Sequence, residues 1–473
     1  MCHKGEVALA AKTEAQAETA RSALAAGKRL LALGIERREG VLVLSFSGVS
    51  VVAGLVGNRL LTGYVDPRPL GELYLLMNLA HWLTVPTASG YVYVQRHWQE
   101  ATAHGAGRWL ARWLGRGLAL QAAIAALGAL LLHLIGVGLT TWPLAGLLLV
   151  VCASQATSQI LDSIQTMERR RWAAGFLQLL GTPSRPFALL LGALLIGCSG
   201  VGLFATQAVY SAVLAGVSVL AFLLVLRGAP RESSSAPEAL AASGLTIGTF
   251  IALSAPSLLS NAMTQGAASA ERWGLALHAD PAQTALFVQA VGLAMSVVGA
   301  ATGFLGIYFA PLFTGAAVGQ ARPIHAAARP LRRFLLSTMA ALGLVVVAFT
   351  LLAHPITRLF FGARFQAVEP LLPWTIAGAA LFQLGQTLFY VPYLARETVS
   401  QMVTYTGSRI VYIALLLGLA GSGASALRFT QFYVIGHILY AVAMAWVAWR
   451  HVRREGQQPL ADPGARASAS VPL

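Results

Sequence analysis

Twelve apolar segments run along this chain, and they constrain its fold more than any other feature. Each is about 20 residues or longer, and a helix of that length, rising 1.5 Å per residue, crosses a hydrocarbon core about 30 Å thick. Hydrophobic residues make up 56% of the chain and charged residues 11%, whereas soluble domains carry roughly 25% charged residues. The sequence therefore predicts an all-α polytopic membrane protein with about twelve transmembrane helices. The predicted spans are Val41–Leu61, Leu70–Val94, Gly117–Leu139, Trp142–Ile164, Ala173–Cys198, Val201–Leu226, Leu245–Ala268, Gln283–Phe309, Phe334–Leu352, Leu371–Tyr393, Ser400–Ala420 and Ala426–Trp449.

Positive charge alternates along the connections between these spans. The even-numbered connections are rich in arginine and the odd-numbered ones are poor in it, which is the asymmetry of the positive-inside rule. We therefore predict that both termini are cytoplasmic and that the protein lies in the cell inner (plasma) membrane. The same asymmetry explains the net charge of +15 without a nucleic-acid partner. The rich set is Arg96, Arg108, Arg112, Arg116, Arg169, Arg170, Arg171, Arg227, Arg231, Arg322, Arg329, Arg332, Arg333 and Arg396, and the poor set is Arg59, Arg68, Arg272, Arg358, Arg364 and Arg428.

The chain divides near its middle, where a polar stretch with three consecutive serines is the only clearly linker-like interior segment. Six spans precede it and six follow, so the two halves have the same orientation, as in parallel repeats. We predict two six-helix bundles around a central cavity. The predicted domains are a cytoplasmic extension (1–40), an N-terminal bundle (41–226), a cytoplasmic linker (227–244), a C-terminal bundle (245–450) and a cytoplasmic tail (451–473).

Two arginines, Arg185 and Arg409, stand near the middle of apolar segments. A charge near the bilayer centre costs about 2.5–3.5 kcal/mol by insertion scales, so it indicates a functional site by default. The repeat makes the fifth span equivalent to the eleventh, which places the two arginines on symmetry-related helices. Asp162 is the one obvious intramembrane carboxylate, so the excess charge is positive and favours an anionic ligand. The alternative is structural: the prolines of Thr182–Pro186 kink the helix, and Arg185 pairs with Asp162 or with backbone carbonyls.

Polar side chains at helical spacing in other spans are placed to line the same cavity. Each set has an alternative role in hydrogen bonding between helices. The candidates are Gln155, Gln159 and Asp162 in the fourth span, Asn261 in the seventh, and Gln383 and Gln386 in the tenth.

Patterns typical of enzymes are missing from the sequence. It contains no GxxxxGK[ST] phosphate-binding loop, no GxSxG turn and no His/Glu metal pattern. The three cysteines, Cys2, Cys152 and Cys198, have no CxxC spacing and indicate neither a disulfide framework nor a metal site. We predict no enzymatic activity, no metal and no cofactor.

Several stretches match the pattern of a known group of membrane proteins. The strongest is Pro355–Gly362 with the residues after it, before the tenth span. Leu60–Tyr74 looks like a first outer loop, Met167–Arg171 like a basic turn after the fourth span, and Gly418–Ala426 like a small-residue turn before the last span. In their order and spacing these stretches resemble the polysaccharide transporters, or O-antigen (lipid-linked oligosaccharide) flippases, of the multidrug/oligosaccharidyl-lipid/polysaccharide exporter superfamily. Glu271–Arg272 stands where that family often has an acidic residue, usually Asp, followed by Arg.

The resemblance implies a flippase that moves polyprenyl-pyrophosphate-linked oligosaccharide units from the cytoplasmic to the outer leaflet by alternating access, for polysaccharide biosynthesis. Arg185 and Arg409 would then clamp the pyrophosphate through bidentate guanidinium contacts, with Arg272 and the polar residues above lining the cavity. A cell-wall precursor flippase is a competitor with the same architecture, but it would be expected to carry fourteen spans rather than twelve. Two further alternatives stay open. One is a cation or drug antiporter of the same superfamily, which would need intramembrane carboxylates. The other is a non-transporting membrane scaffold whose partners are other polysaccharide-assembly proteins.

Overall fold

The computed structural model describes most of the predicted membrane region. It covers residues 49–103, 142–167, 184–227, 247–317, 322–395, 397–419 and 425–457, together with the short pieces 115, 119, 122–128, 130–131, 134, 181 and 320. Within these residues the regular structure is entirely helical, and each of the twelve predicted spans contains helix. The prediction of an all-α polytopic membrane protein is confirmed. The predicted extension 1–40, nearly all of the linker 227–244 and most of the tail 451–473 lie outside the described residues.

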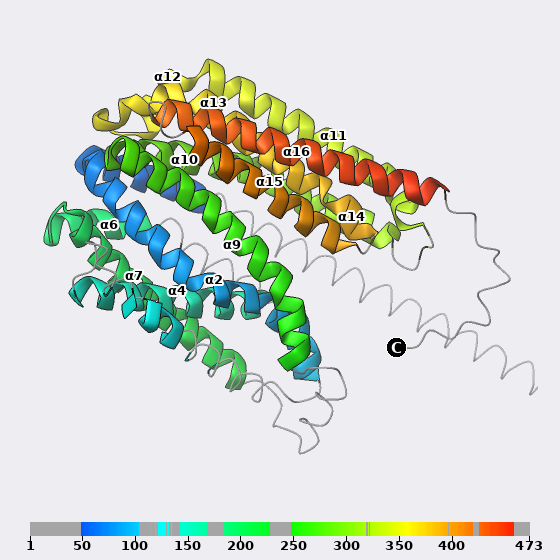
Figure 1. The fold of residues 1–473 in the computed structure, drawn as a ribbon, viewed down its shortest axis with the longest axis horizontal. Helices are drawn as coiled ribbons and strands as arrows, with labels where there is room; N and C mark the ends of the chain where they lie inside the picture. Colours follow the sequence, from blue (N-terminus) through cyan, green and yellow to red (C-terminus); the bar gives the residue numbers. More distant parts are fainter. Residues whose placement is uncertain are drawn as a thin grey trace, which may run out of the picture.

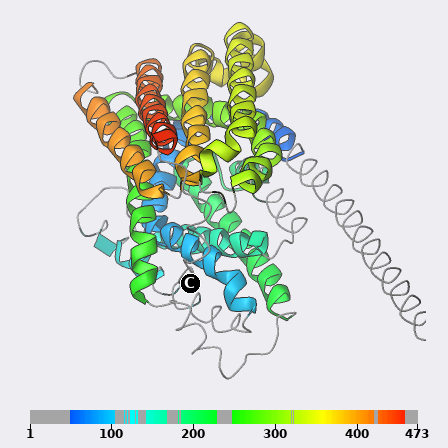
Figure 2. The same cartoon turned by 90° about the vertical axis from the view of Figure 1, so that its right-hand side faces the viewer.

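The helices pack as two groups, one from each half of the chain (Figures 1 and 2). The first group contains the helix at 49–64, α2 (Pro67–Ala103), α4 (Trp142–Met167), α6 (Ser184–Leu195) and α7 (Gly200–Arg227). The second contains α9 (Ile247–His278), α10 (Pro281–Ala317), α11 (Pro323–Leu351), α13 (Leu372–Leu388), α15 (Thr398–Leu419) and α16 (Ala426–Gln457). Three short helices, α12 (Ala353–Phe360), η1 (Ala363–Leu371) and α14 (Tyr390–Leu394), connect members of the second group.

Six of the described helices are long and apolar enough to cross a membrane by length and composition. They include the stretches Trp142–Leu161, Gly200–Leu224, Pro281–Gly303, Pro323–Leu351, Ala363–Leu394 and Ala426–Gln457. Helix α9 is not among them, although it is 32 residues long. Its predicted span ended at Ala268, whereas the helix continues to His278 and carries Glu271 and Arg272 in its interior. The prediction ended too early because two adjacent charges close a hydropathy window even where neighbouring helices accommodate them.

Glycines allow close approach between helices of the second group. Gly378 and Gly385 on α13 receive the rings of Tyr433 and Tyr440 on α16, and a Cβ at either glycine would overlap its tyrosine. Both pairs are seven residues apart in the same direction, so α13 and α16 run parallel, as the tenth and twelfth spans should. Small residues that let helices approach are typical of packing in membranes, where the hydrophobic effect does not drive helix association.

The two groups share an apolar core at one end. Leu61, Val65 and Leu70 of the first group pack in one buried cluster with residues of the second such as Phe287 and Phe361. This end carries the arginine-poor connections. At the arginine-rich end the second group has a separate core of its own, which includes Phe313, Leu331, Phe334 and Val391.

Candidate functional site

The two groups meet along α2, which packs against both α9 and α10. Asn78, fully buried on α2, is the centre of this contact. Its side-chain oxygen accepts hydrogen bonds from the Ser269 hydroxyl at 2.8 Å and from the Trp273 indole at 3.1 Å. Its backbone carbonyl accepts one from the Gln265 amide at 3.0 Å, and the Trp82 indole donates to the Ser269 hydroxyl at 2.6 Å. A polar network therefore joins the halves in the parts of α2 and α9 that are nearer the arginine-poor end.

Nearer the arginine-poor end, a second set of hydrogen bonds and close contacts joins the two halves. The backbone amide of Gly362 donates to the Thr62 hydroxyl at 3.0 Å, and a Cβ at Gly362 would overlap the Thr62 backbone. Arg364 pairs with Asp66 at 3.0 Å and donates to the Tyr64 carbonyl at 3.0 Å. Only a glycine fits at Gly71, where a Cβ would collide with the Pro281 carbonyl. We call the contact between the two halves the seam. These contacts close its arginine-poor end.

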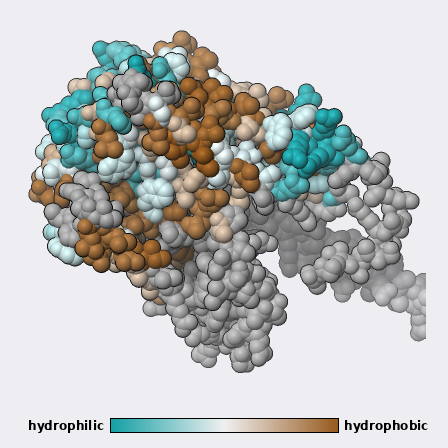
Figure 3. All heavy atoms as spheres, viewed as in Figure 1, coloured by the Kyte–Doolittle hydropathy of each residue, from teal (hydrophilic) through white to brown (hydrophobic). Residues whose placement is uncertain are grey.

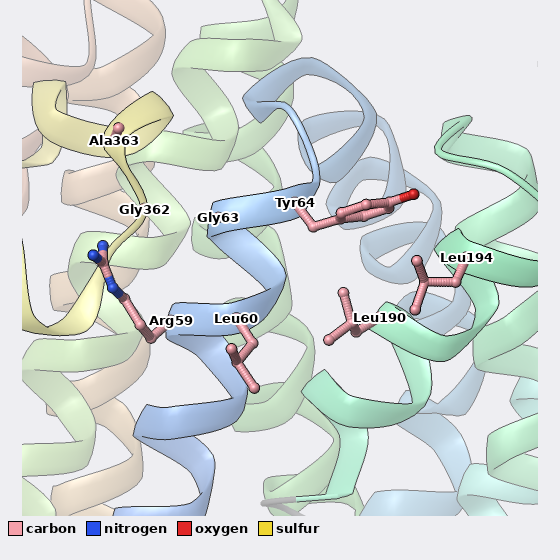
Figure 4. Close-up of a pocket in the computed structure, with 8 residues that line it drawn as sticks. All are labelled: Arg59, Leu60, Gly63, Tyr64, Leu190, Leu194, Gly362 and Ala363. Atoms are coloured by element: carbon pink, nitrogen blue, oxygen red, sulfur yellow. The ribbon is translucent and has the colours of Figure 1, made fainter.

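A groove of about 490 Å³ lies beside this closure (Figure 4). Arg59 and Tyr64 contribute from the first helix, Leu190 and Leu194 project from α6, and Gly362 forms part of the opposite wall. One terminal nitrogen of Arg59 is buried with no hydrogen-bond partner among the described residues. The groove therefore combines leucine side chains with one cation.

A pair of cations from opposite halves, Arg185 and Arg272, lies elsewhere along the contact between the halves. Arg185 lies on α6 and Arg272 on α9, both half-buried and within electrostatic range of each other. Tyr74 and His81, one on each side of Asn78 along α2, lie within electrostatic range of both arginines. No hydrogen bond or ion pair neutralises the Arg272 side chain within the described part of the chain, apart from the general attraction of the adjacent Glu271. We call Arg185, Arg272, Tyr74 and His81 the seam cluster.

Neutral amides hold the members of the seam cluster in place. The Arg185 Nε donates to the Gln207 side-chain oxygen at 2.7 Å, and the buried Gln207 amide donates to Ser211 at 3.0 Å, so α7 orients the guanidinium. The buried Gln289 amide on α10 donates to the Tyr74 hydroxyl at 2.6 Å. Since a glutamine adds no charge, the positive charge of the cluster stays uncompensated by these contacts. Charge at membrane depth is costly, and an intramembrane ionisable residue is by default a functional-site hypothesis.

A different group of residues surrounds Arg409, inside the second half. Arg409 is 7% exposed and lies over the rings of Tyr405 and Phe382, at 5.0 and 5.5 Å from their centroids. Glu271, 8% exposed on α9, lies within electrostatic range of Arg409 and accepts a 2.7 Å hydrogen bond from the Tyr412 hydroxyl. We call Glu271, Arg409, Tyr405, Phe382 and Tyr412 the inner cluster. It has one charge of each sign, so it is close to neutral.

The structure divides the predicted arginine pair between these two clusters. No interaction of the described residues joins Arg185 to Arg409, and their joint clamp stays a prediction. The structural alternative paired Arg185 with Asp162 or with carbonyls, whereas its described partner is Gln207. The side chain of Asp162 and residues 182–183 lie outside what the structure describes.

The other predicted residues are spread over three helices. Gln155 is half-buried on α4, and its side-chain oxygen has no hydrogen-bond partner among the described residues, while Gln159 is exposed. Asn261 is half-buried on α9, two turns or more from Arg272 along the same helix. Gln383 and Gln386 are half-buried on α13. None of these is linked to the seam cluster by a described contact, so their place in a cavity stays a prediction.

Sequence reasoning missed several residues that hold the clusters. Gln207 is the one amide side chain of α7, and Gln289 shares the largely apolar α10 with Gln283; an amide in an apolar helix was the available signal. Tyr412 gave no signal, because a tyrosine in a membrane helix is ordinary. For metals, the described residues contain no group of three or more His, Cys, Asp or Glu side chains placed to hold an ion.

Comparisons with known proteins define the fold. No protein-family model matches the chain, and no curated protein matches its sequence. Among solved structures it is similar to a multidrug resistance MATE transporter of the MOP superfamily in an inward-facing conformation, with a TM-score of 0.63 and 14% identity over 89% of this chain and 99% of that one. It is also similar to the lipid II flippase MurJ in an inward closed conformation, with a TM-score of 0.64 and 13% identity over 88% and 90%.

A third similar structure is a MOP superfamily transporter from Pyrococcus furiosus, described as having a binding pocket of reverse polarity that suggests a different function. The TM-score is 0.56 and the identity 14%, over 89% of this chain and 96% of that one. These likenesses extend over nearly the whole of each structure. The chain has the fold of the MOP superfamily transporters.

Proposed function

We propose that the protein is a flippase that moves polyprenyl-pyrophosphate-linked oligosaccharide units across the cell inner membrane for polysaccharide biosynthesis. The observation that carries the proposal is the seam cluster: Arg185 and Arg272 come from opposite halves, and among the described residues the carboxylate in electrostatic range of Arg272 is Glu271, which also interacts with Arg409. A pyrophosphate supplies the missing negative charge, and guanidinium groups bind its oxygens in bidentate fashion. The fold, shared with a lipid II flippase, supports a lipid-linked substrate.

The position of the cluster suits alternating access. Because each half contributes one arginine, a bound anion attracts both halves and stabilises the state in which they close around it. The arginine-poor end is closed by Asn78 and by the Thr62–Gly362 contact. Under the positive-inside rule that end faces outward, so the substrate enters from the cytoplasmic side, where lipid-linked units are assembled. The polyprenyl tail stays in the bilayer throughout.

The remaining predicted residues belong to this proposal as lining of the glycan path. Amide side chains hydrogen-bond sugar hydroxyls without adding charge. Gln155, Gln383 and Gln386 are half-buried and available for this role. Arg409 has a different role, because Glu271 on α9 balances its charge. We assign it a structural role: it helps to position α9, which carries Arg272.

The experiment is to delete the gene and measure lipid-linked oligosaccharides on the cytoplasmic leaflet, then complement with variants at native expression level. We expect one lipid-linked sugar to accumulate in the deletion strain. Arg185→Gln with Arg272→Gln should leave the accumulation in place and lower surface glycan at least tenfold, while the chain still inserts. Arg428→Gln, which removes one arginine at the start of α16, is the matched control and should restore export. Absence of any accumulated lipid-linked sugar would contradict the proposal.

A second candidate is an antiporter for cations or drugs, and one observation favours it. Glu271 is a buried carboxylate at membrane depth, and a cation-binding transporter needs such a group. The MATE transporters that share the fold support the same candidate. Drug susceptibility of a strain carrying Glu271→Gln separates the two: an antiporter loses resistance, whereas the drug susceptibility of a strain with a flippase stays unchanged.

A further inference from the structure

A second basic site lies within the second group of helices, between α10 and α11. A groove of about 440 Å³ runs between α10 and α11, lined by Phe309 and Leu312 on one wall and by Arg329, Pro330 and Arg333 on the other. This volume falls in the range of small-molecule sites, about 300–1,000 Å³. The two arginines are four residues apart, so they lie on one face of α11, one above the other. Both are exposed, and no ion pair of either is found among the described residues.

The same face of α11 becomes apolar directly beyond Arg333. Leu336 follows at the next helical position on that face and is exposed, as is Met339 one turn further. From Phe334 to Leu351 the helix carries no charged residue. That stretch of 18 residues is about 27 Å long at 1.5 Å per residue, close to the thickness of a hydrocarbon core of about 30 Å. Arg333 therefore stands at the boundary between hydrocarbon and headgroups.

Helix α16 gives an independent marker of depth. Glu455 near its end accepts hydrogen bonds from the backbone amides of Ile324 and His325 at the start of α11, at 3.1 and 3.2 Å. The two helices are antiparallel and meet at this face, so Trp446 and Trp449 lie at about the depth of Arg329 to Arg333. Both tryptophans are exposed, with arginines over their rings. Exposed tryptophans are typical of the interface between membrane and water.

The surface agrees with this placement. Figure 3, which shows the side of the molecule where α15 and α16 lie in front, has hydrophobic residues over its middle and hydrophilic residues toward both ends, one of them the end where α16 finishes. A groove with two cations at headgroup depth and leucine and methionine along its continuation matches an amphipathic molecule with an anionic head. Basic pockets between transmembrane helices on the cytoplasmic side are known to bind anionic lipid headgroups.

We propose that Arg329 and Arg333 bind the phosphodiester of an anionic glycerophospholipid of the membrane leaflet at the arginine-rich face, with an acyl chain packed along Leu312 and Leu336. Two guanidinium groups one helical turn apart contact the phosphate oxygens together. The lipid bridges α10 to α11 at the end where the second half has its separate core. This inference does not depend on the substrate of the seam cluster, because the groove is lined by residues of α10 and α11 and none of them belongs to that cluster.

The test uses the whole protein, purified in detergent and delipidated, with native mass spectrometry after addition of phosphatidylglycerol or phosphatidylcholine of the same acyl chains. We expect the native chain to retain phosphatidylglycerol in preference to phosphatidylcholine. Arg329→Gln with Arg333→Gln should lower retention of phosphatidylglycerol at least fivefold. Arg332→Gln is the matched control: it is exposed on the same helix but does not line the groove, and retention should stay within twofold of the native chain.

A second variant keeps the charges of Arg329 and Arg333 but fills the groove between α10 and α11. Leu312→Trp fills the groove from α10, and we expect a similar loss of phosphatidylglycerol although both arginines remain; it carries the test if the double variant does not fold. Equal retention by the double variant and the native chain, or full retention by Leu312→Trp, would overturn the proposal. Preferential retention of farnesyl pyrophosphate at the groove would overturn it as well, since the site would then hold lipid-linked pyrophosphates rather than a glycerophospholipid.

Discussion

The seam cluster and the inner cluster contain adjacent residues of α9, Arg272 and Glu271, and these two residues have different charged neighbours. Glu271 faces the second half, where Arg409 balances its charge and Tyr412 donates a hydrogen bond. Arg272, one position later and about 100° further around the helix, faces the first half and meets Arg185, another cation. Among the described residues the inner cluster has one charge of each sign, whereas the seam cluster has two arginines whose carboxylate in range, Glu271, also interacts with Arg409.

This difference separates structural charge from functional charge. A buried ion pair is balanced when the protein folds, and it serves to fix how helices pack. Two like charges contributed by opposite halves are balanced only when an anion arrives. A transporter needs an unbalanced site of this kind, because binding must change the relative stability of two arrangements of the halves. The three variants below test the comparison, from the largest expected effect on stability to the smallest.

The largest loss of stability is expected from a substitution of Glu271 in the inner cluster. Glu271→Ala leaves Arg409 buried without its counter-charge and Tyr412 without its acceptor, so we expect a loss of about 3 kcal/mol in stability, measured as a lower thermal midpoint in detergent. Adding Arg409→Met to this variant should restore most of the loss. Glu369→Ala, which breaks a surface pair with His354 at 2.9 Å, is the control and should cost under about 1 kcal/mol. A Glu271→Ala midpoint equal to the control would show that Arg409 needs no balancing charge.

Asn78 tests whether the seam is held by polar contacts that have to break. Asn78→Leu keeps the number and branching of the side-chain heavy atoms but removes the acceptor for Ser269 and Trp273, and unsatisfied buried groups cost about 1–3 kcal/mol. The closed state should become less populated, with a longer mean distance between spin labels placed on α2 and α9. Thr430→Val removes a buried hydroxyl that bonds only within α16 and should leave that distance unchanged. No change with Asn78→Leu would mean that apolar packing alone closes the seam.

The smallest effect is expected at the surface of the closure. Arg364 and Asp66 are 50% and 63% exposed, so their ion pair contributes about 0.2–1 kcal/mol and is screened by salt. Arg364→Gln should shift the same label distances slightly at low ionic strength and not at all in 1 M salt. A change in label distance as large as that of Asn78→Leu would mean that the contacts at the outer end contribute most to closing the seam.

The sequence predicted the spans well, because length and hydropathy determine what can cross a bilayer. It also identified Arg185 and Arg409 individually, since charge inside an apolar segment is visible without a structure, whereas Arg272, beyond the predicted end of its span, was named through the family resemblance. Their partners were not predictable. Pairing Arg185 with Arg409 followed from the repeat, whereas the described interactions of Arg409 depend on α9 continuing past Ala268 to bring Glu271 into the second half. Which side of a helix meets which neighbour is a property of tertiary packing.

The central claim is that the seam cluster, and not the inner cluster, binds the anionic part of the substrate. Binding of farnesyl pyrophosphate to the purified protein, compared with farnesol, tests this directly by calorimetry. Arg185→Gln with Arg272→Gln should weaken pyrophosphate binding at least tenfold and leave farnesol unaffected. Glu271→Gln with Arg409→Gln, which removes one charge of each sign, should leave pyrophosphate binding within threefold. Loss of binding in the second variant and not in the first would contradict the account.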